Sequence, residues 1–260
     1  MHHLFSAAGD VALAAVLQRR PVLGFDFDGT LAPIVARPDE ARVPPALAEQ
    51  LKALAALRPV VVISGRAAAD LRHRLGFEPW HVVGSHGADD PLAPAEAAAF
   101  AAALEPLRER LHRHTDVLAA HGVTVEDKQQ SIALHYRRAR APARALALLR
   151  RLLEPAPPGV QTFGGKRVLN AVAIGAPDKA RAMHELVQRC GADCALFAGD
   201  DVNDEPVFAA APADWLTVRV GDGSQGARPG AARFFVDGPE QMGGLIERAL
   251  ELLRLAAAQR

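Results

Sequence analysis

The hydrophobic positions of this chain fall into short apolar runs that alternate with amphipathic stretches, first near the N-terminus and again near the C-terminus. Short apolar runs bounded by Gly, Pro or polar residues are typical of buried strands, and the stretches between them have helical spacing. Strands are predicted at residues 22–25, 60–64, 81–84, 195–198, 215–220 and 233–236. Helices are predicted in a short N-terminal segment and at residues 44–58, 66–75, 178–190, 204–211 and 239–258. This alternation predicts an α/β protein with one doubly wound, Rossmann-like parallel sheet.

The segment between the two alternating stretches has a different order of predicted elements. It repeats a helix followed by two strands, and its predicted elements are a helical stretch at 95–121, strands at 123–126 and 132–136, a helix at 142–153, and strands at 160–163 and 166–173. Such a pattern indicates a small α+β module inserted into the larger sheet. We therefore expect a core made of residues 1–93 and 175–260, with an inserted cap at residues 94–174.

Composition narrows the class of protein. Half of the 260 residues are hydrophobic, which favours a globular fold, and the formal net charge of zero argues against a broad electrostatic contact with nucleic acid. No apolar run approaches the length needed to cross a membrane, so we expect a soluble, cytoplasmic protein without a membrane partner. Cys190 and Cys194 are too few for a disulfide framework and form no zinc-type cluster. The sequence predicts no oligomeric state.

Two carboxylates follow the first predicted strand of the core. Asp26 and Asp28 are one residue apart, so an extended backbone sends both side chains to the same side, and Gly29 permits a sharp turn beside a ligand. Ionised groups next to an apolar interior are costly unless something pairs with them. The pair therefore suits a metal ion and a phosphate, although a solvated Asp-Gly turn would give the same local pattern.

Two further segments bring polar groups to the same edge of the sheet. Ser64 follows an apolar strand and opens a helix, where backbone amides can face an anion, although serine is also a common helix cap. After residues 195–198 comes Gly199-Asp200-Asp201-Val202-Asn203-Asp204-Glu205, which carries four acidic residues. All-oxygen ligands without a Cys or His cluster favour Mg²⁺, which also binds phosphate oxygens.

A lysine at the start of a helix could balance this negative charge. Arginine is the commoner cation in this chain, and its lysines are Lys52, Lys128, Lys166 and Lys179. Lys179 begins the helix that leads back into the predicted sheet, so its ammonium can reach the strand ends. An ordinary exposed lysine at a helix start would look the same.

These segments resemble the haloacid dehalogenase superfamily of phosphotransferases, whose four motifs match Asp26-Phe27-Asp28-Gly29-Thr30, Ser64, Lys179 and Gly199-Asp200-Asp201. More narrowly, the chain is similar to trehalose-6-phosphate phosphatases. That similarity also includes Ser64-Gly65-Arg66, Gly84-Ser85-His86-Gly87, Glu126-Asp127-Lys128, Ser131, His135-Tyr136-Arg137 and Gly165-Lys166. It extends over nearly the whole chain.

The resemblance implies roles for the core residues. Asp26 would be the nucleophile that forms an aspartyl-phosphate, and Asp28 would act as acid and then as base. Ser64 and Lys179 would hold the phosphate, and Mg²⁺ would be held by Asp26, the backbone carbonyl of Asp28, and Asp200, with Asp201 in support. Residues expected to contact the substrate in the core are Gly29, Thr30, Gly65, Arg66 and His86.

The resemblance further implies that the insert is a mobile cap that reads the sugar of a small sugar phosphate. Glu126, Lys128 and Lys166 would contact its hydroxyls. The family commonly has a V-x-E-x-R-P strand after Gly-Lys, but this chain has Asn170 and Val172 in place of the glutamate and the arginine. Asn170 keeps a hydroxyl partner without the charge. The sequence therefore favours trehalose 6-phosphate and leaves open sucrose 6-phosphate, a glycosyl-phosphoglycerate, or a sugar-phosphate sensor without catalysis.

Overall fold

The computed structural model describes residues 1–165, 167–221 and 230–258, which divide into two compact units. The first unit contains residues 1–87 and 177–260, and the second contains residues 88–176. These limits lie a few residues from the boundaries expected from the sequence. Each unit has its own sheet and its own apolar core.

A seven-stranded parallel sheet forms the centre of the first unit, in the order β1-β11-β10-β9-β2-β3-β4. Its strands are β1 (His2–His3), β2 (Pro21–Phe25), β3 (Val60–Ile63), β4 (His81–Val83), β9 (Cys194–Gly199), β10 (Leu216–Val220) and β11 (Phe234–Val236). Strands β2, β3, β9 and β10 are buried along their whole length, as expected for a sheet covered on both faces. The predicted α/β fold class is confirmed.

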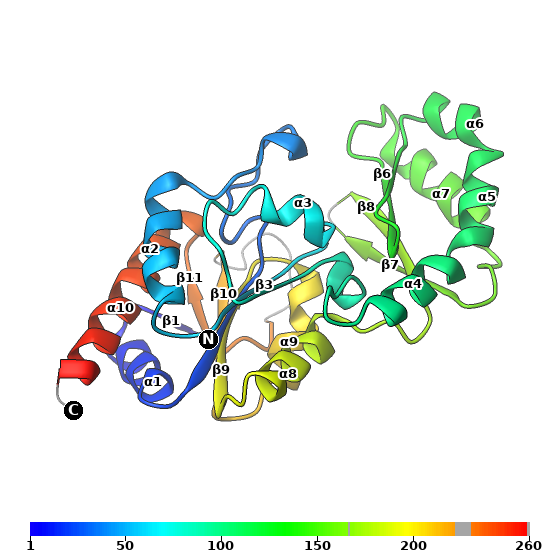
Figure 1. The fold of residues 1–260 in the computed structure, drawn as a ribbon. Helices are drawn as coiled ribbons and strands as arrows, with labels where there is room; N and C mark the ends of the chain where they lie inside the picture. The colour runs from blue at the N-terminus through cyan, green and yellow to red at the C-terminus, as the bar shows by residue number, and fades with distance from the viewer. Residues whose placement is uncertain (166, 222–229, 259–260) are drawn as a thin grey trace. The chain divides into compact units, whose positions relative to one another are not determined.

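Helices lie on both sides of this sheet (Figure 1). One layer contains α1 (Ala7–Leu17), α2 (Pro45–Ala55) and α10 (Met242–Ala258), with α10 packed against both α1 and α2. The other layer contains α8 (Lys179–Arg189) and α9 (Glu205–Ala210). The short helix α3 (Ala68–Arg72) contacts β4, and 3-10 turns occur at η1 (Pro38–Glu40), η2 (Ser85–Gly87), η3 (Val202–Asp204) and η4 (Pro239–Gln241). Strands β2 and β9 pair in the middle, so the carboxyl ends of both open at one edge of the sheet.

Two predicted helices of the first unit differ from the structure, and one strand was not predicted. The strand β1 was not expected, because two histidines carry no hydrophobic pattern and the strand exists only through its pairing with β11. The helix predicted at 66–75 is reduced to α3, and the helix predicted at 239–258 begins with the 3-10 turn η4 before α10. Propensity alone does not set these ends, because tertiary contacts compete with it.

The second unit contains a four-stranded antiparallel sheet in the order β5-β6-β8-β7. Its strands are β5 (Thr124–Asp127), β6 (Ser131–His135), β7 (Val160–Gly165) and β8 (Val168–Ala173), and its long helix is α7 (Pro142–Leu153). The stretch expected as one helical region at 95–121 is three helices, α4 (Pro94–Ala103), α5 (Glu105–His112) and α6 (Thr115–Ala120). Pro106, in the first turn of α5, cannot donate a backbone hydrogen bond to continue α4.

Alternation along the strands separates the two faces of the second sheet. Ile132, Leu134 and Ala171 point to one face and join the apolar cluster that includes Leu107 and Leu149 of the helices. The opposite face carries Glu126, Ala133 and Asn170, which are cross-strand neighbours in register. In the part of the chain that the structure describes, no helix is long and apolar enough to span a membrane.

Candidate active site

Asp26 lies at the carboxyl end of β2 and is held there by backbone pairing. Its backbone N–H donates to the carbonyl of Ala198 at 2.9 Å, which continues the β2–β9 ladder by one residue. Its side chain is only 6 % exposed, and its Oδ1 lies 2.9 Å from Nζ of Lys179. The same ammonium donates to Oδ1 of Asp204 at 2.7 Å. One buried lysine therefore joins a carboxylate that directly follows β2 to a carboxylate of the turn η3 that follows β9.

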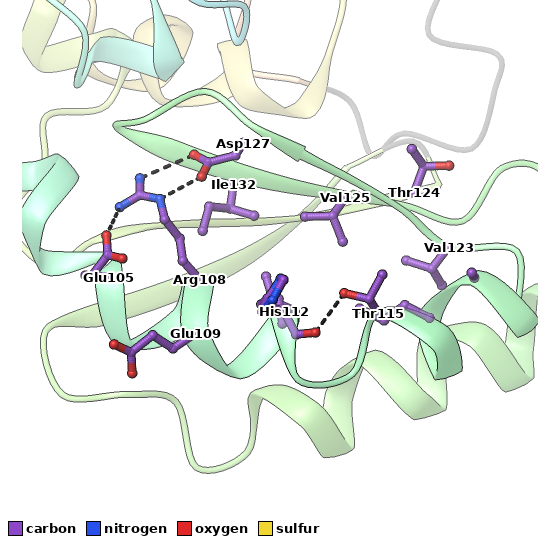
Figure 2. Close-up of a pocket in the computed structure, with 13 residues that line it drawn as sticks. Glu105, Arg108, Glu109, His112, Thr115, Val123, Thr124, Val125, Asp127 and Ile132 are labelled. Atoms are coloured by element: carbon purple, nitrogen blue, oxygen red, sulfur yellow. Dashed lines mark hydrogen bonds and ion pairs between the residues drawn. The ribbon is translucent and has the colours of Figure 1, made fainter.

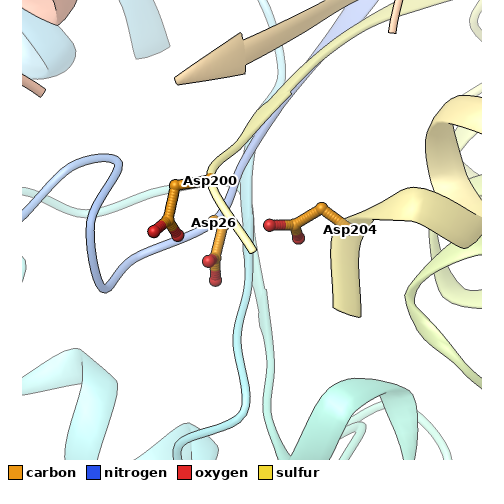
Figure 3. A group of neighbouring side chains, drawn as sticks. All are labelled: Asp26, Asp200 and Asp204. Carbon is orange, nitrogen blue, oxygen red and sulfur yellow. The ribbon is translucent and has the colours of Figure 1, made fainter. Parts of the chain in front are cut away.

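Three carboxylates gather at this point. An oxygen from each of Asp26, Asp200 and Asp204 lies within 4.8 Å of the others, and Figure 3 shows the three side chains converging. Gly29 lies directly against this group, because it has φ +82° and a Cβ there would collide with the Asp200 carboxylate. The turn after β2 and the loop after β9 thus approach each other more closely than a larger residue would permit.

Burial and neighbouring charges have opposing effects on the pKa values of Asp26 and Lys179. Burial raises the pKa of Asp26 well above its usual value, Lys179 lowers it, and the nearby Asp204 and Asp200 carboxylates raise it further. Burial alone would lower the pKa of Lys179, but Asp204 and Asp26 outweigh burial and raise it. Lys179 is therefore held as a cation between two carboxylates.

The donor set of the cluster fits a hard divalent cation, because it consists of carboxylate oxygens alone. Both oxygens of Asp204 already accept from protein groups, Oδ1 from Lys179 and Oδ2 from the backbone N–H of Asp201 at 2.9 Å. Asp201 in turn caps η3 with its side chain. Asp26 and Asp200 are consequently the better placed metal ligands, with Asp204 and Asp201 shaping the loop.

Asp28 takes part in a different interaction from Asp26. Its two oxygens accept from Arg66, Oδ1 from Nη2 and Oδ2 from Nε, both at 2.7 Å. Arg66 also donates to Asp70 at 3.2 Å, and Asp70 accepts a second fork from Arg74 at 2.7 and 2.5 Å. Arg66 and Arg74 are 12 % and 11 % exposed, so this is a largely covered array.

The residues around Ser64 are braced by the loop after β4. The backbone N–H of Ser64 donates to Val83, and His86 donates from its backbone to the Ser64 carbonyl at 2.9 Å. The His86 ring covers Gly65, where a Cβ would lie 2.5 Å from the ring carbon Cε1. The structure therefore brings Ser64, Gly65, Arg66 and His86 together.

Thr30 lies in the turn after Asp28. It is fully buried, and its hydroxyl has no hydrogen-bond partner among the residues the structure describes. Its backbone N–H donates to the Phe27 carbonyl at 3.3 Å, which closes the turn.

Candidate sugar-contacting residues lie in the second unit. Oε2 of Glu126 lies 2.8 Å from Nε2 of His135 and 3.5 Å from Nζ of Lys128. Burial alone would raise the pKa of Glu126, but the hydrogen bond from His135 and the charge of Lys128 lower it to about 2. Lys166 lies outside the described residues.

Asn170 lies two strands away from Glu126 on the same face, with Ala133 between them in register. It is 4 % exposed, and its Nδ2 has no hydrogen-bond partner among the described residues. Where the family commonly has a glutamate carboxylate, this chain therefore has a buried amide donor.

A hollow of about 690 Å³ lies in the second unit beside α5, α6 and β5 (Figure 2). Val125, Asp127 and Ile132 line it, and these belong to the face of the sheet opposite Glu126 and Asn170. Arg108 also lines it and donates to the carboxylates of Asp127 and Glu105. The hollow is therefore separate from the candidate sugar-contacting face.

Two residues of the candidate site, Asp204 and Asp70, were not assigned roles from the sequence. Asp204 belongs to the acidic run, but only the structure shows that it, rather than Asp201, meets Lys179. Asp70 could have been found from its spacing, because Arg66, Asp70 and Arg74 recur every fourth residue and such pairs meet on a helical turn.

Several known proteins are similar in sequence to this chain. A trehalose-phosphate phosphatase of Mycobacterium avium (strain 104) is 32% identical over 252 residues, which cover 90% of this chain and 63% of that protein. An uncharacterized glycosyl hydrolase of Mycobacterium tuberculosis (strain ATCC 25618 / H37Rv) is 35% identical over 235 residues, which cover 85% of this chain and 18% of that protein. The chain thus spans less than two thirds of either relative.

The fold also has close structural counterparts. A crystal structure described as a trehalose-6-phosphate phosphatase related protein superposes with a TM-score of 0.72 at 20% identity, covering 92% of this chain and all of that one. The trehalose-phosphatase family model matches residues 24–240, most of the sequence. The resemblance noted from the motifs is confirmed, and the chain belongs to the trehalose-phosphatase family.

Proposed function

We propose that this chain is a Mg²⁺-dependent phosphatase that hydrolyses trehalose 6-phosphate to trehalose and phosphate through an aspartyl-phosphate on Asp26. The observation that carries this proposal is the buried Asp26 carboxylate, paired with Lys179 and adjoining Asp200 at the carboxyl end of β2. A carboxylate in this position has no packing role that an apolar residue would not fill better. Ligands of doubly wound sheets bind at this edge.

The reaction divides into two displacement steps. In the first, an oxygen of Asp26 attacks the phosphorus, the bond from phosphorus to the sugar oxygen breaks, and that oxygen takes a proton from Asp28. In the second, water attacks the phosphorus and gives its proton to Asp28, the acyl phosphate bond breaks, and phosphate and free Asp26 are formed. Lys179 and Ser64 hold the transferring group and balance its charge.

The carboxylates of Asp26 and Asp200 and the backbone carbonyl of Asp28 would hold the cation. A bound Mg²⁺ would offset the repulsion of the carboxylates and withdraw charge from the phosphoryl oxygens. Two unit charges about 4 Å apart repel by about 4 kcal/mol at an effective dielectric of 20, so the cluster has a strong electrostatic reason to bind a cation.

We assign recognition of the sugar to the face of the second unit that carries Glu126, Lys128 and Asn170. Paired charges and a buried amide are suited to hydroxyl groups, because each offers a fixed donor or acceptor. The buried Nδ2 of Asn170 favours a hydroxyl acceptor where the family commonly has glutamate, which is a specific reason to test other glycosyl phosphates.

A phosphate-release panel tests this assignment. The purified chain with Mg²⁺ is expected to release phosphate fastest from trehalose 6-phosphate, compared at equal concentration with sucrose 6-phosphate, a glycosyl-phosphoglycerate and 4-nitrophenyl phosphate. A faster reaction with another sugar phosphate would refute the substrate while keeping the reaction. Binding without release from any of them would favour a sensor.

A further inference from the structure

Asp28 is held by a side chain whose own surroundings leave it little freedom. Arg66 presents Nε and Nη2 to the two oxygens of Asp28 in a fork, which fixes the plane of the carboxylate as well as its position. The two residues are 38 positions apart in sequence and come from the ends of β2 and β3. The contact is therefore a product of the fold.

The Arg66 guanidinium makes further contacts with the protein. Nη1 donates to Asp70 at 3.2 Å, Nη2 donates to the carbonyl of Pro38 at 2.9 Å, and the group lies over the Phe27 ring at 5.2 Å from its centre. Asp70 is itself held by the fork from Arg74. An arginine held by these contacts is better suited to orient a carboxylate than to bind a mobile phosphate group.

We propose that Arg66 is a positioning residue that holds Asp28 in the arrangement needed to accept the proton of the attacking water. This rests on the proposed function, and it deepens that function by giving Arg66 a task in the second step. The fork holds both oxygens of Asp28 in fixed positions, as is required of a carboxylate that must accept a proton from one particular direction. Asp70 and Arg74 keep the fork in place.

The test uses 4-nitrophenyl phosphate, whose leaving group departs without a proton from Asp28. Only the second step then depends on Asp28, so a defect in its placement should make the aspartyl-phosphate accumulate. The protein is acid-quenched during turnover, and the phosphorylated fraction is measured by intact mass. The variants are Arg66→Gln and Arg66→Lys, which keeps the charge but loses the fork.

Arg66→Gln should slow turnover by on the order of 100-fold and raise the phosphorylated fraction above that of the unchanged protein. Arg66→Lys should shift both in the same direction. Arg72→Gln is the matched control, because Arg72 ends α3, the helix that follows Arg66, and pairs only with exposed Glu78 among the described residues; it should change neither. Melting temperatures identify any variant that is merely unfolded.

A phosphorylated fraction that falls or stays constant in both Arg66 variants would overturn this inference alone. It would indicate that Arg66 binds phosphate or supports the fold. If the unchanged protein released phosphate but no phosphorylated protein could be detected, even in single-turnover quenches, the proposed mechanism would be overturned. This inference would be overturned with it.

Discussion

The ammonium of Lys179 lies 2.9 Å from the carboxylate of Asp26, and the two side chains are 3 % and 6 % exposed. Lys179 begins α8 and Asp26 directly follows β2, so a helix start and the end of a strand meet at one buried ion pair. Asp204 shares the same ammonium. This arrangement couples the stability of the first unit to the group that we propose as nucleophile.

Lys179→Met should therefore affect both stability and turnover. The change leaves Asp26 and Asp204 buried without their cation, which should cost about 3 kcal/mol of unfolding free energy. Urea denaturation in the absence of Mg²⁺ measures this cost. Lys52→Met is the control, since Lys52 is 69 % exposed and lies 4.0 Å from Glu49; it should change the free energy by less than about 0.5 kcal/mol. Equal effects of the two changes would contradict the buried-pair account.

Because Gly29 lies against Asp200, the turn after β2 is expected to affect metal binding at the proposed site. Gly29→Ala places a methyl group against the Asp200 carboxylate at a backbone φ of +82°. We expect the Mg²⁺ concentration for half-maximal phosphate release to rise at least about tenfold, since a displaced ligand weakens the site. Gly164→Ala is a suitable control, because a Cβ there meets nothing within 4 Å. An unchanged Mg²⁺ requirement in Gly29→Ala would separate Asp200 from metal binding.

Glu126 predicts a pH dependence of stability in the second unit. Its pKa in the folded protein is lowered from the usual 4.5 to about 2, so its ionised form stabilises the fold above about pH 4.5. That contribution is lost as the pH falls from about 4.5 towards 2. Because the side chain is 49 % exposed, we expect Glu126→Gln to cost only about 1 kcal/mol near pH 6.

The measurement is urea denaturation of both proteins across this pH range. The difference between them should narrow as the pH decreases, and Glu154→Gln, an exposed change in the same unit, should show no such trend. A difference that grows at low pH would have the wrong sign for this account.

Lys128 tests the assignment of sugar recognition. Lys128→Ala should raise KM for trehalose 6-phosphate about tenfold or more, the effect of losing one charge-assisted hydrogen bond. KM for 4-nitrophenyl phosphate should stay within about twofold, because this substrate has no sugar. Steady-state kinetics on both substrates make the comparison. Equal increases would mean that this face does not bind the sugar.

The sequence was most informative where local chemistry and buried strands coincide. Asp26 and Asp200 each follow a strand whose apolar run is readily recognised, so their meeting at one edge follows from parallel topology. The contact between Asp28 and Arg66 could not be predicted in the same way, since side-chain partners 38 residues apart depend on how the loops fold.

Elements that depend on contacts with distant parts of the chain also could not be predicted from the sequence. The strand β1 forms only against β11, and alanine-rich composition concealed the two breaks that separate α4, α5 and α6. Nothing in the local pattern distinguishes Asp204 from Asp201 as the partner of Lys179. Their roles follow from the 3-10 turn η3, which uses Asp201 as its cap.

The most direct test of the central claim is to locate the phosphoryl group during turnover. The protein is acid-quenched with trehalose 6-phosphate and Mg²⁺ and digested, and the peptide that contains Asp26 and Asp28 is fragmented in a mass spectrometer. We predict one phosphoryl group on Asp26, and no phosphorylation or turnover in a folded Asp26→Asn protein. A phosphoryl group on another residue, or substantial phosphate release by Asp26→Asn, would contradict the account.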